Sequence, residues 1–374
     1  MYSDYQRGYL KQEPTIVDVG FSTVHHVSFC LPENEMRTPI VIIGGAFQNF
    51  SSFSKEVEAL FEINPVIIVA LPGQITNYQC TRGMSIDDLT LVLMGYMVSQ
   101  KMERVSIVGI SFGGLIAMKF GLNFPDQVEK LVLYGVTSNA DGTLKSILLR
   151  FVQLVENDKT EELAEGITNN SIRILNAALD LGEKNIYCDT LIITGRYDNF
   201  VRPIESIKIY NHCKRAHIAL FLSGDHLLYT RHSGKLISLY KQFFKGESFT
   251  SCDEVVYDKD AIEILEEKRL MPRYEAHSTE VKVSNDKQKS FQFSVLDINQ
   301  EGCRFRLNRE SPFIEEIIPN YMYKIEILGS DVELKGSIIL DPDKRYGRVV
   351  FLKLYFEEMF KINMYIEDTI AGGK

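Results

Sequence analysis

Long apolar runs are missing from this sequence. No stretch approaches the ~18 consecutive apolar residues that a membrane-spanning helix needs, so we expect no membrane span. The N-terminal residues Met1 to Arg7 are polar and show no apolar core of a secretory signal. Together with the scattered cysteines described next, these absences predict a protein of the cytoplasm.

Paired cysteines and an excess of positive charge are missing as well. The six cysteines are scattered and form no Cys-x-x-Cys pair, so we expect reduced thiols, no disulfide framework and no metal site. The formal net charge of -9 argues against binding to a nucleic acid polymer, which needs a basic field to neutralise phosphates.

The first part of the chain alternates short apolar strands with amphipathic helices. The strands are continuously apolar, which indicates a parallel sheet covered by helices on both faces. One helix is expected from Ser85 to Lys101, with Ser85 as its cap and acidic residues in its first turn. The expected strands are residues 40–43, 65–70, 105–108, 130–134, 190–193 and 217–221.

At 374 residues the chain is long enough for about two domains. We expect the first domain at residues 1–247, with a short helical cap inserted at about 138–185. The acidic, weakly apolar segment 248–267 is expected to be a linker or connecting helix. Residues 268–374 then show short runs of period-two alternation and a final helix, which predicts a small antiparallel β-barrel.

A glycine-serine motif lies between the third apolar strand and the following helix. It reads Gly109-Ile110-Ser111-Phe112-Gly113. A turn this tight needs small flanking residues, and it raises the serine hydroxyl above the carboxyl ends of the strands. Ser111 is therefore the candidate nucleophile.

An acid and a base follow later strands in the order that such a site requires. Asp198 comes after the fifth strand, and His226 comes after the sixth. We expect His226 to take the proton of Ser111, and Asp198 to orient the imidazole and stabilise its charged form.

Two backbone N–H groups should stabilise the oxyanion that forms when the serine attacks. One is expected from Phe112, directly after the nucleophile. The other is expected from Ala46 or Phe47, in the loop after the first apolar strand. No cofactor is expected for the reaction itself.

Together these features resemble the α/β-hydrolase superfamily over nearly the whole of residues 15–244. The resemblance implies an α/β-hydrolase fold with a short helical cap. In place of the Asp-x-Pro-Gly that is common in that family, this chain has Ala70-Leu71-Pro72-Gly73. The Gly-Gly-Ala-Phe loop and the short cap also resemble acyltransferases that join hydroxyacyl chains.

The barrel region begins with a second pair of motifs. Arg269 and Arg273 form Arg-x-x-x-Arg, and the run from Asp297 through Asn299 to Gly302 follows about twenty-five residues later. This pair resembles the PilZ domain, with Asn299 where that family prefers serine. The resemblance implies a bacterial protein that binds cyclic di-GMP. Arginine forks pair with phosphates and stack on purines; Lys268 would add charge, Asp297 and Asn299 would bind the guanine edge, and Gly302 would allow close approach of the base.

The leading hypothesis is a bacterial cytoplasmic serine hydrolase, an esterase, thioesterase or related acyl-processing enzyme, regulated by cyclic di-GMP. One alternative is a non-catalytic cyclic di-GMP effector whose hydrolase-like domain binds a partner or small molecule. A second is an acyltransferase acting on hydroxyacyl substrates. The substrate, the sign of the regulation and the oligomeric state do not follow from the sequence.

Overall fold

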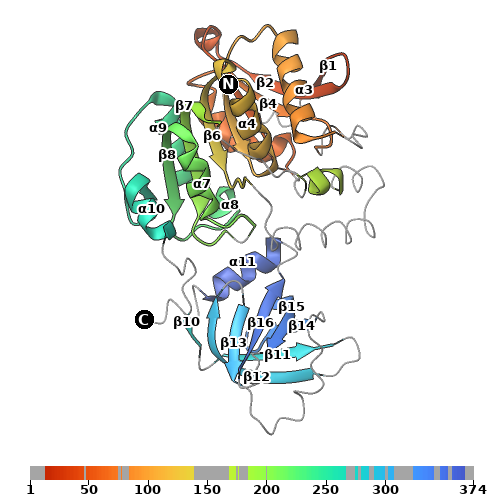
Figure 1. Ribbon diagram of the computed structural model, residues 1–374, viewed down its shortest axis with the longest axis vertical. Helices are drawn as coiled ribbons and strands as arrows, with labels where there is room; N and C mark the ends of the chain where they lie inside the picture. Colours follow the sequence, from red (N-terminus) through yellow and green to blue (C-terminus); the bar gives the residue numbers. More distant parts are fainter. Residues whose placement is uncertain are drawn as a thin grey trace, which may run out of the picture. The chain divides into compact units, whose positions relative to one another are not determined.

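The structure is a computed structural model in which the chain forms two compact units, residues 1–268 and 269–374 (Figure 1). The residues that it describes are 13–45, 48–74, 77, 84–138, 168–173, 176, 184–198, 200–266, 274–276, 279–285, 290–299, 302–306, 323–340, 346–352 and 356–366. Within these ranges, no helix combines the length and the apolar character that crossing a membrane requires.

A nine-stranded mixed sheet forms the first unit, in the order β1-β2-β4-β3-β5-β6-β7-β8-β9. The strands from β4 to β8 run parallel, while β1, β2 and β9 pair antiparallel at the two edges. The strands are β1 (Thr15–Asp18), β2 (Thr23–Phe29), β3 (Ile40–Ile43), β4 (Val66–Ala70), β5 (Val105–Ile110), β6 (Val128–Tyr134), β7 (Ile186–Gly195), β8 (Cys213–Phe221) and β9 (Val255–Tyr257).

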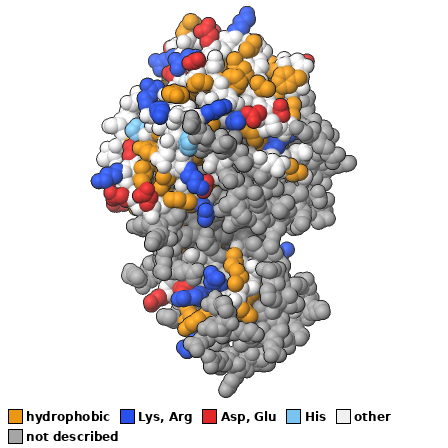
Figure 2. Space-filling model, viewed as in Figure 1, with side chains coloured by type: hydrophobic (Ala, Val, Ile, Leu, Met, Phe, Trp, Pro, Cys, Tyr) orange, Lys and Arg blue, Asp and Glu red, His pale blue; other side chains and the backbone are white. Residues whose placement is uncertain are grey.

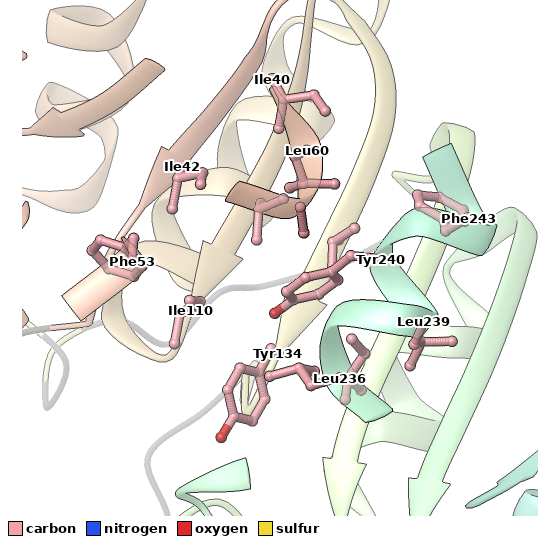
Figure 3. Close-up of a cluster of buried hydrophobic side chains, with 14 of the residues drawn as sticks. Ile40, Ile42, Phe53, Leu60, Ile110, Tyr134, Leu236, Leu239, Tyr240 and Phe243 are labelled. Atoms are coloured by element: carbon pink, nitrogen blue, oxygen red, sulfur yellow. The ribbon is translucent and has the colours of Figure 1, made fainter. Parts of the chain in front are cut away.

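Helices cover both faces of this sheet. Figure 3 shows α2 and α9 supplying Leu60, Leu239 and Phe243 to one apolar core, which also takes alternate strand residues such as Ile42 and Ile110. Helices α3 and α4 pack on each other, and α4 packs on β5 and β6. The helices are α2 (Ser54–Leu60), α3 (Ile86–Ser99), α4 (Phe112–Asn123), α7 (Glu205–Asn211), α8 (Leu228–Arg231), α9 (Ser233–Lys245) and α10 (Asp258–Glu266).

The predicted strands and the Ser85 cap of α3 match these elements. Ser85 accepts the N–H of Asp88, and the Asp88 carboxylate accepts the N–H of Ser85, which together form a capping box. Most of the expected cap at 138–185 lies outside the described residues. Its described part includes a helical segment at 168–173.

The segment 248–267, expected as a linker, contributes structure to the first unit. Strand β9 extends the sheet beside β8, with Val255 and Tyr257 buried. Helix α10 buries Ala261 and Leu265, one turn apart, against the same unit. Most of the described acidic residues of the segment are exposed, so its composition alone suggested a connector; they are Asp253, Glu254, Asp260, Glu263 and Glu266.

The second unit contains a closed, six-stranded antiparallel barrel, so the predicted barrel is confirmed. The strands follow one another around it in the order β12-β11-β14-β15-β16-β13, and β13 pairs again with β12; the short β10 pairs with the end of β12. Phe305 and Ile325 are fully buried among the inward-facing residues. Its elements are β10 (Tyr274–Glu275), β11 (Glu280–Ser284), β12 (Ser290–Asn299), β13 (Gly302–Arg306), β14 (Tyr323–Ile327), β15 (Glu333–Leu340), β16 (Tyr346–Leu352) and α11 (Phe356–Tyr365).

The described surface mixes charged side chains of both signs with small apolar areas. Figure 2 shows this pattern on the visible face. Isolated exposed apolar side chains such as Met36 and Val98 are ordinary on a folded protein.

The start of α10 provides a test of its attachment to the sheet. One carboxylate oxygen of Asp258 accepts the N–H of Ile218 at 3.1 Å, and the other lies 2.9 Å from Nδ1 of His217. Because these bonds join α10 to β8, we expect Asp258→Ala to lower the free energy of unfolding by ~1 kcal/mol in urea titrations followed by circular dichroism.

Lys259→Ala is the matched control. Its ammonium lies 3.7 Å from Glu263 in an ion pair that is largely exposed, so its removal should leave the unfolding midpoint nearly unchanged. Equal midpoints for the two variants would contradict the attachment of α10 through Asp258.

Candidate active site

Ser111 occupies a strained turn between β5 and α4. Its backbone has φ 51° and ψ -112°, a conformation that a residue with a side chain rarely adopts. A Cβ on Gly113 would lie 2.2 Å from the carbonyl oxygen of Ile43, and one on Gly109 would lie 2.6 Å from Cβ of Ala117. The glycines of the motif are therefore needed for the helix to pack this close to the strands.

The structure brings Ser111, His226 and Asp198 together at the carboxyl ends of their strands. Nε2 of His226 lies 3.2 Å from Oγ of Ser111, and Nδ1 of His226 lies 2.7 Å from Oδ2 of Asp198. The serine and the histidine are 115 residues apart in the sequence. The three side chains thus form one hydrogen-bonded chain.

The second carboxylate oxygen of Asp198 is held by the backbone. Oδ1 accepts the N–H groups of Phe200 at 2.9 Å and Val201 at 2.8 Å. Asp198 is almost fully buried, so these bonds stabilise a charge that would otherwise be costly to remove from water. They also fix which oxygen faces the imidazole.

The environment of His226 favours its charged form. Burial of the ring lowers the pKa of His226, but the charge and hydrogen bond of Asp198 and the charge of Asp225 more than offset this, so its pKa is raised above 6.5. The carboxylate of Asp225 accepts the N–H of Leu227 at 2.7 Å and so also shapes the turn that carries the histidine. A base of this kind can hold a proton taken from Ser111.

The predicted oxyanion donors are described in part. Phe112 is the first residue of α4, and N–H groups in the first turn of a helix have no partner within the helix. Ala46 and Phe47 lie outside the described residues. The preceding Gly45 N–H donates to Oε1 of Gln48 at 2.7 Å, so it is already engaged.

Two glutamines that the sequence did not point to shape this loop. Gln48 accepts from Gly45, as described, and the buried Gln74 donates through Nε2 to the carbonyl oxygen of Gly44 at 2.8 Å. Oε1 of Gln74 accepts the N–H of Leu71 at 2.8 Å. Gln74 therefore ties the loop after β3 to the loop after β4, where the expected Asp-x-Pro-Gly is absent.

Gly135 is a third residue that the sequence did not single out. It has φ 59°, and a Cβ at this position would lie 2.9 Å from Cε1 of His226. A glycine directly after β6 therefore leaves room for the imidazole ring.

In the second unit, the structure describes three of the six predicted cyclic di-GMP residues. Asp297 and Asn299 are buried near the end of β12, where the β12–β13 register shifts. Nη2 of Arg304 lies 2.7 Å from Oδ2 of Asp297, and Oδ1 of Asn299 accepts the N–H of Gly302 at 3.1 Å. Lys268, Arg269 and Arg273 lie outside the described residues.

Gly302 has a structural reason to be glycine. A Cβ there would lie 2.0 Å from the carbonyl oxygen of Val349 on the neighbouring β16. The resemblance to PilZ implied that this glycine allows close approach of a base. In the structure, strand packing within the barrel is sufficient to require it.

Comparison with known proteins supports the fold of the first unit. The Ndr family matches residues 43–172, about a third of the chain. The 2-hydroxy-6-oxononadienedioate/2-hydroxy-6-oxononatrienedioate hydrolase 1 of Pseudomonas putida is 25% identical, over 53% of this chain and 85% of that protein.

Solved structures extend the likeness over nearly two thirds of the chain. An alpha/beta hydrolase enzyme from a Medee basin deep-sea metagenome library has a TM-score of 0.58 at 14% identity, covering 64% of this chain and 100% of that one. An esterase from Exiguobacterium antarcticum has a TM-score of 0.55 at 18% identity, covering 62% and 99%. The α/β-hydrolase fold expected for the first unit is thereby confirmed.

The pKa of His226 gives a test of the hydrogen-bonded chain. Burial lowers the pKa of His226, and the charge of Asp198 raises it. Asp198→Asn removes that charge, so we expect the pKa of His226 to fall, as measured by NMR of histidine-labelled protein. Because the folded pKa is raised above the unfolded value, the associated stability is present below about pH 6.5 and is lost as pH rises through the folded pKa. Asp198→Asn should therefore lower the free energy of unfolding more at about pH 6 than at about pH 8.5.

Asp225→Asn is the control for this titration. The charge of Asp225 raises the pKa of His226 less than the charge and hydrogen bond of Asp198 do, so the pKa of His226 should fall by less. An equal fall in the two variants would show that the hydrogen bond to Asp198 has no special role.

Proposed function

We propose that the first unit is a serine hydrolase that cleaves esters or thioesters of a small acyl substrate. The observation that carries the proposal is the hydrogen-bonded chain from Ser111 through His226 to Asp198, with the serine in a glycine-flanked turn. The relative from Pseudomonas putida, whose name describes a hydrolase, supports hydrolysis as the general reaction.

In this mechanism, Oγ of Ser111 attacks the acyl carbon while Nε2 of His226 takes the hydroxyl proton. The carbonyl oxygen becomes an oxyanion, for which the Phe112 N–H and the loop after β3 are the proposed donors. Collapse breaks the bond to the leaving alcohol or thiol, which receives the proton from His226. Water, deprotonated by His226, then attacks the acyl-serine and releases the acid and the free Ser111 hydroxyl.

The same three side chains are compatible with transfer of the acyl group to an acceptor other than water. An acyltransferase on hydroxyacyl substrates would use the first half of this mechanism and deliver the acyl group to an acceptor hydroxyl. Product analysis with and without added hydroxyacyl acceptor separates the two reactions, because the transferase gives a joined product and the hydrolase gives the free acid.

Covalent labelling with a fluorophosphonate tests the nucleophile. The full-length protein should be labelled, and Ser111→Ala should abolish labelling because no other residue is proposed to attack the phosphorus. His226→Gln should slow labelling by about 10³-fold or more, since the serine loses its base. A panel of acyl esters and thioesters of graded chain length then defines the substrate.

Ser106→Ala is the matched control, since Ser106 lies buried in the same strand, β5, away from the turn. It should be labelled like the wild type. If the wild type is not labelled, with or without cyclic di-GMP, the catalytic proposal fails, and a non-catalytic effector becomes the better description.

We further propose that the second unit binds cyclic di-GMP and that this binding regulates the first. The support is the PilZ-like pair of motifs, together with the buried Asp297 and Asn299 at the end of β12. A buried carboxylate and amide can bond a guanine edge, and the two arginines of Arg-x-x-x-Arg can pair with phosphates. Regulation further requires that the ligand bind two states of the protein with different affinity.

Calorimetry with cyclic di-GMP tests this second proposal. The full-length protein should bind the dinucleotide, and Arg269→Ala should weaken binding at least about tenfold through the loss of a charge-assisted phosphate contact. Lys324→Ala is the control, because that lysine pairs with Glu326 and Glu333 on β14 and β15 and carries the same charge. If the wild type releases no heat of binding, the barrel is structural and the regulatory proposal fails.

A further inference from the structure

Tyr134, the last residue of β6, makes hydrogen bonds to both of the turns that carry the candidate nucleophile and base. Its carbonyl oxygen accepts the N–H of Ser111 at 2.8 Å. Its hydroxyl donates to the carbonyl oxygen of His226 at 2.5 Å and accepts the N–H of Leu228 at 2.7 Å. One side chain and its own backbone thus connect the serine turn to the histidine turn.

The hydrogen bonds of Tyr134 do not involve the reacting atoms. The groups bound by Tyr134 are backbone groups, so Oγ of Ser111 and both ring nitrogens of His226 keep their own partners. The tyrosine ring lies beside the imidazole, with ring centroids 6.3 Å apart. Tyr134 can therefore set where the imidazole is without taking part in proton transfer.

Tyr134 makes these hydrogen bonds in a buried, apolar environment. Its side chain is 1% exposed and lies in the apolar core with Ile110, Leu236 and Tyr240, as Figure 3 shows. Water does not compete there, and an unpaired carbonyl or N–H at the histidine turn would be costly. Burial, with the nearby Tyr240 and the charge of Asp198, raises the pKa of Tyr134 well above its ordinary value, so the hydroxyl remains a donor.

We infer that Tyr134 is a positioning residue that holds His226 at hydrogen-bond distance from Ser111. The inference rests on the proposed function for its kinetic consequence, but its structural content stands apart from it. Without the hydroxyl, the turn at 226–228 loses two bonds to the core, and the imidazole is free to move away from both Asp198 and Ser111. A displacement of about 1 Å at such a site is enough to slow a reaction by about 10²-fold.

Tyr240 provides an internal control for the removal of a buried hydroxyl. It is fully buried in the same core, and its hydroxyl has no hydrogen-bond partner among the described residues. Tyr240→Phe and Tyr134→Phe therefore make the same chemical change in the same environment. They differ because only Tyr134→Phe removes hydrogen bonds to the turn at 226–228.

The experiment measures the pKa of His226 in full-length, histidine-labelled wild type, Tyr134→Phe and Tyr240→Phe by NMR, with His226→Gln assigning the signal. We expect Tyr134→Phe to lower this pKa by about 0.5 units or more, because the raising effect of Asp198 weakens with distance. Tyr240→Phe should leave it unchanged. Fluorophosphonate labelling should slow about 10- to 100-fold in Tyr134→Phe, and not in Tyr240→Phe.

A general loss of stability would not give this result, because it lowers the folded fraction without moving the pKa of the folded protein. If Tyr134→Phe does not fold, 4-aminophenylalanine is placed at position 134. Its nitrogen keeps the donor but accepts poorly, so we expect a smaller fall in the pKa of His226.

An unchanged pKa of His226 in the substituted protein overturns the inference. A lowered pKa in a protein that the fluorophosphonate never labels supports the positioning role and contradicts the proposed function. The two ideas can thus fail separately.

Discussion

The packing of α4 against the ends of β3 and β5, with glycines where side chains would clash, is the constraint on which the candidate site depends. It forces the strained backbone of Ser111 and brings the start of the helix to the carboxyl edge of the sheet. The parallel order β5-β6-β7-β8 then places Ser111, Tyr134, Asp198 and His226 along one edge. Each of these residues ends or follows a strand, so their spacing derives from the register of the sheet.

The position of these residues at strand ends explains which of them could be predicted from the sequence. Continuous apolar strands reveal a parallel sheet, and residues just after such strands must share an edge, so Ser111, Asp198 and His226 could be chosen from the sequence. Gln48, Gln74 and Tyr134 could not, because they bond to backbone groups and no spacing marks such a contact. Tyr134 and His226 are 92 residues apart. In the second unit, alternation revealed every strand of the closed barrel, whereas the glycine at 302 had a packing role that the motif could not indicate.

In the second unit, buried polar side chains lie where strand β12 departs from regular pairing. The register shift in β12 lies beside Asp297, whose buried carboxylate pairs with Arg304 on β13. The Arg304 side chain of this pair is half exposed, and such ion pairs contribute little to the free energy of unfolding. Under the proposed regulation, a ligand bound there acts by favouring one of two states, and a substrate of the first unit then changes the affinity for that ligand by the same factor.

The short strand β9 has a consequence for the solubility of the first unit. It covers the edge of β8 by pairing antiparallel with residues 219–221, and in doing so it buries Val255 and Tyr257. An uncovered edge strand is a template for pairing with other chains. A shortened protein that ended before residue 255 would keep the residues of the candidate site but expose that edge, and it would be prone to aggregate through it. The acidic segment that resembled a connector therefore protects the sheet.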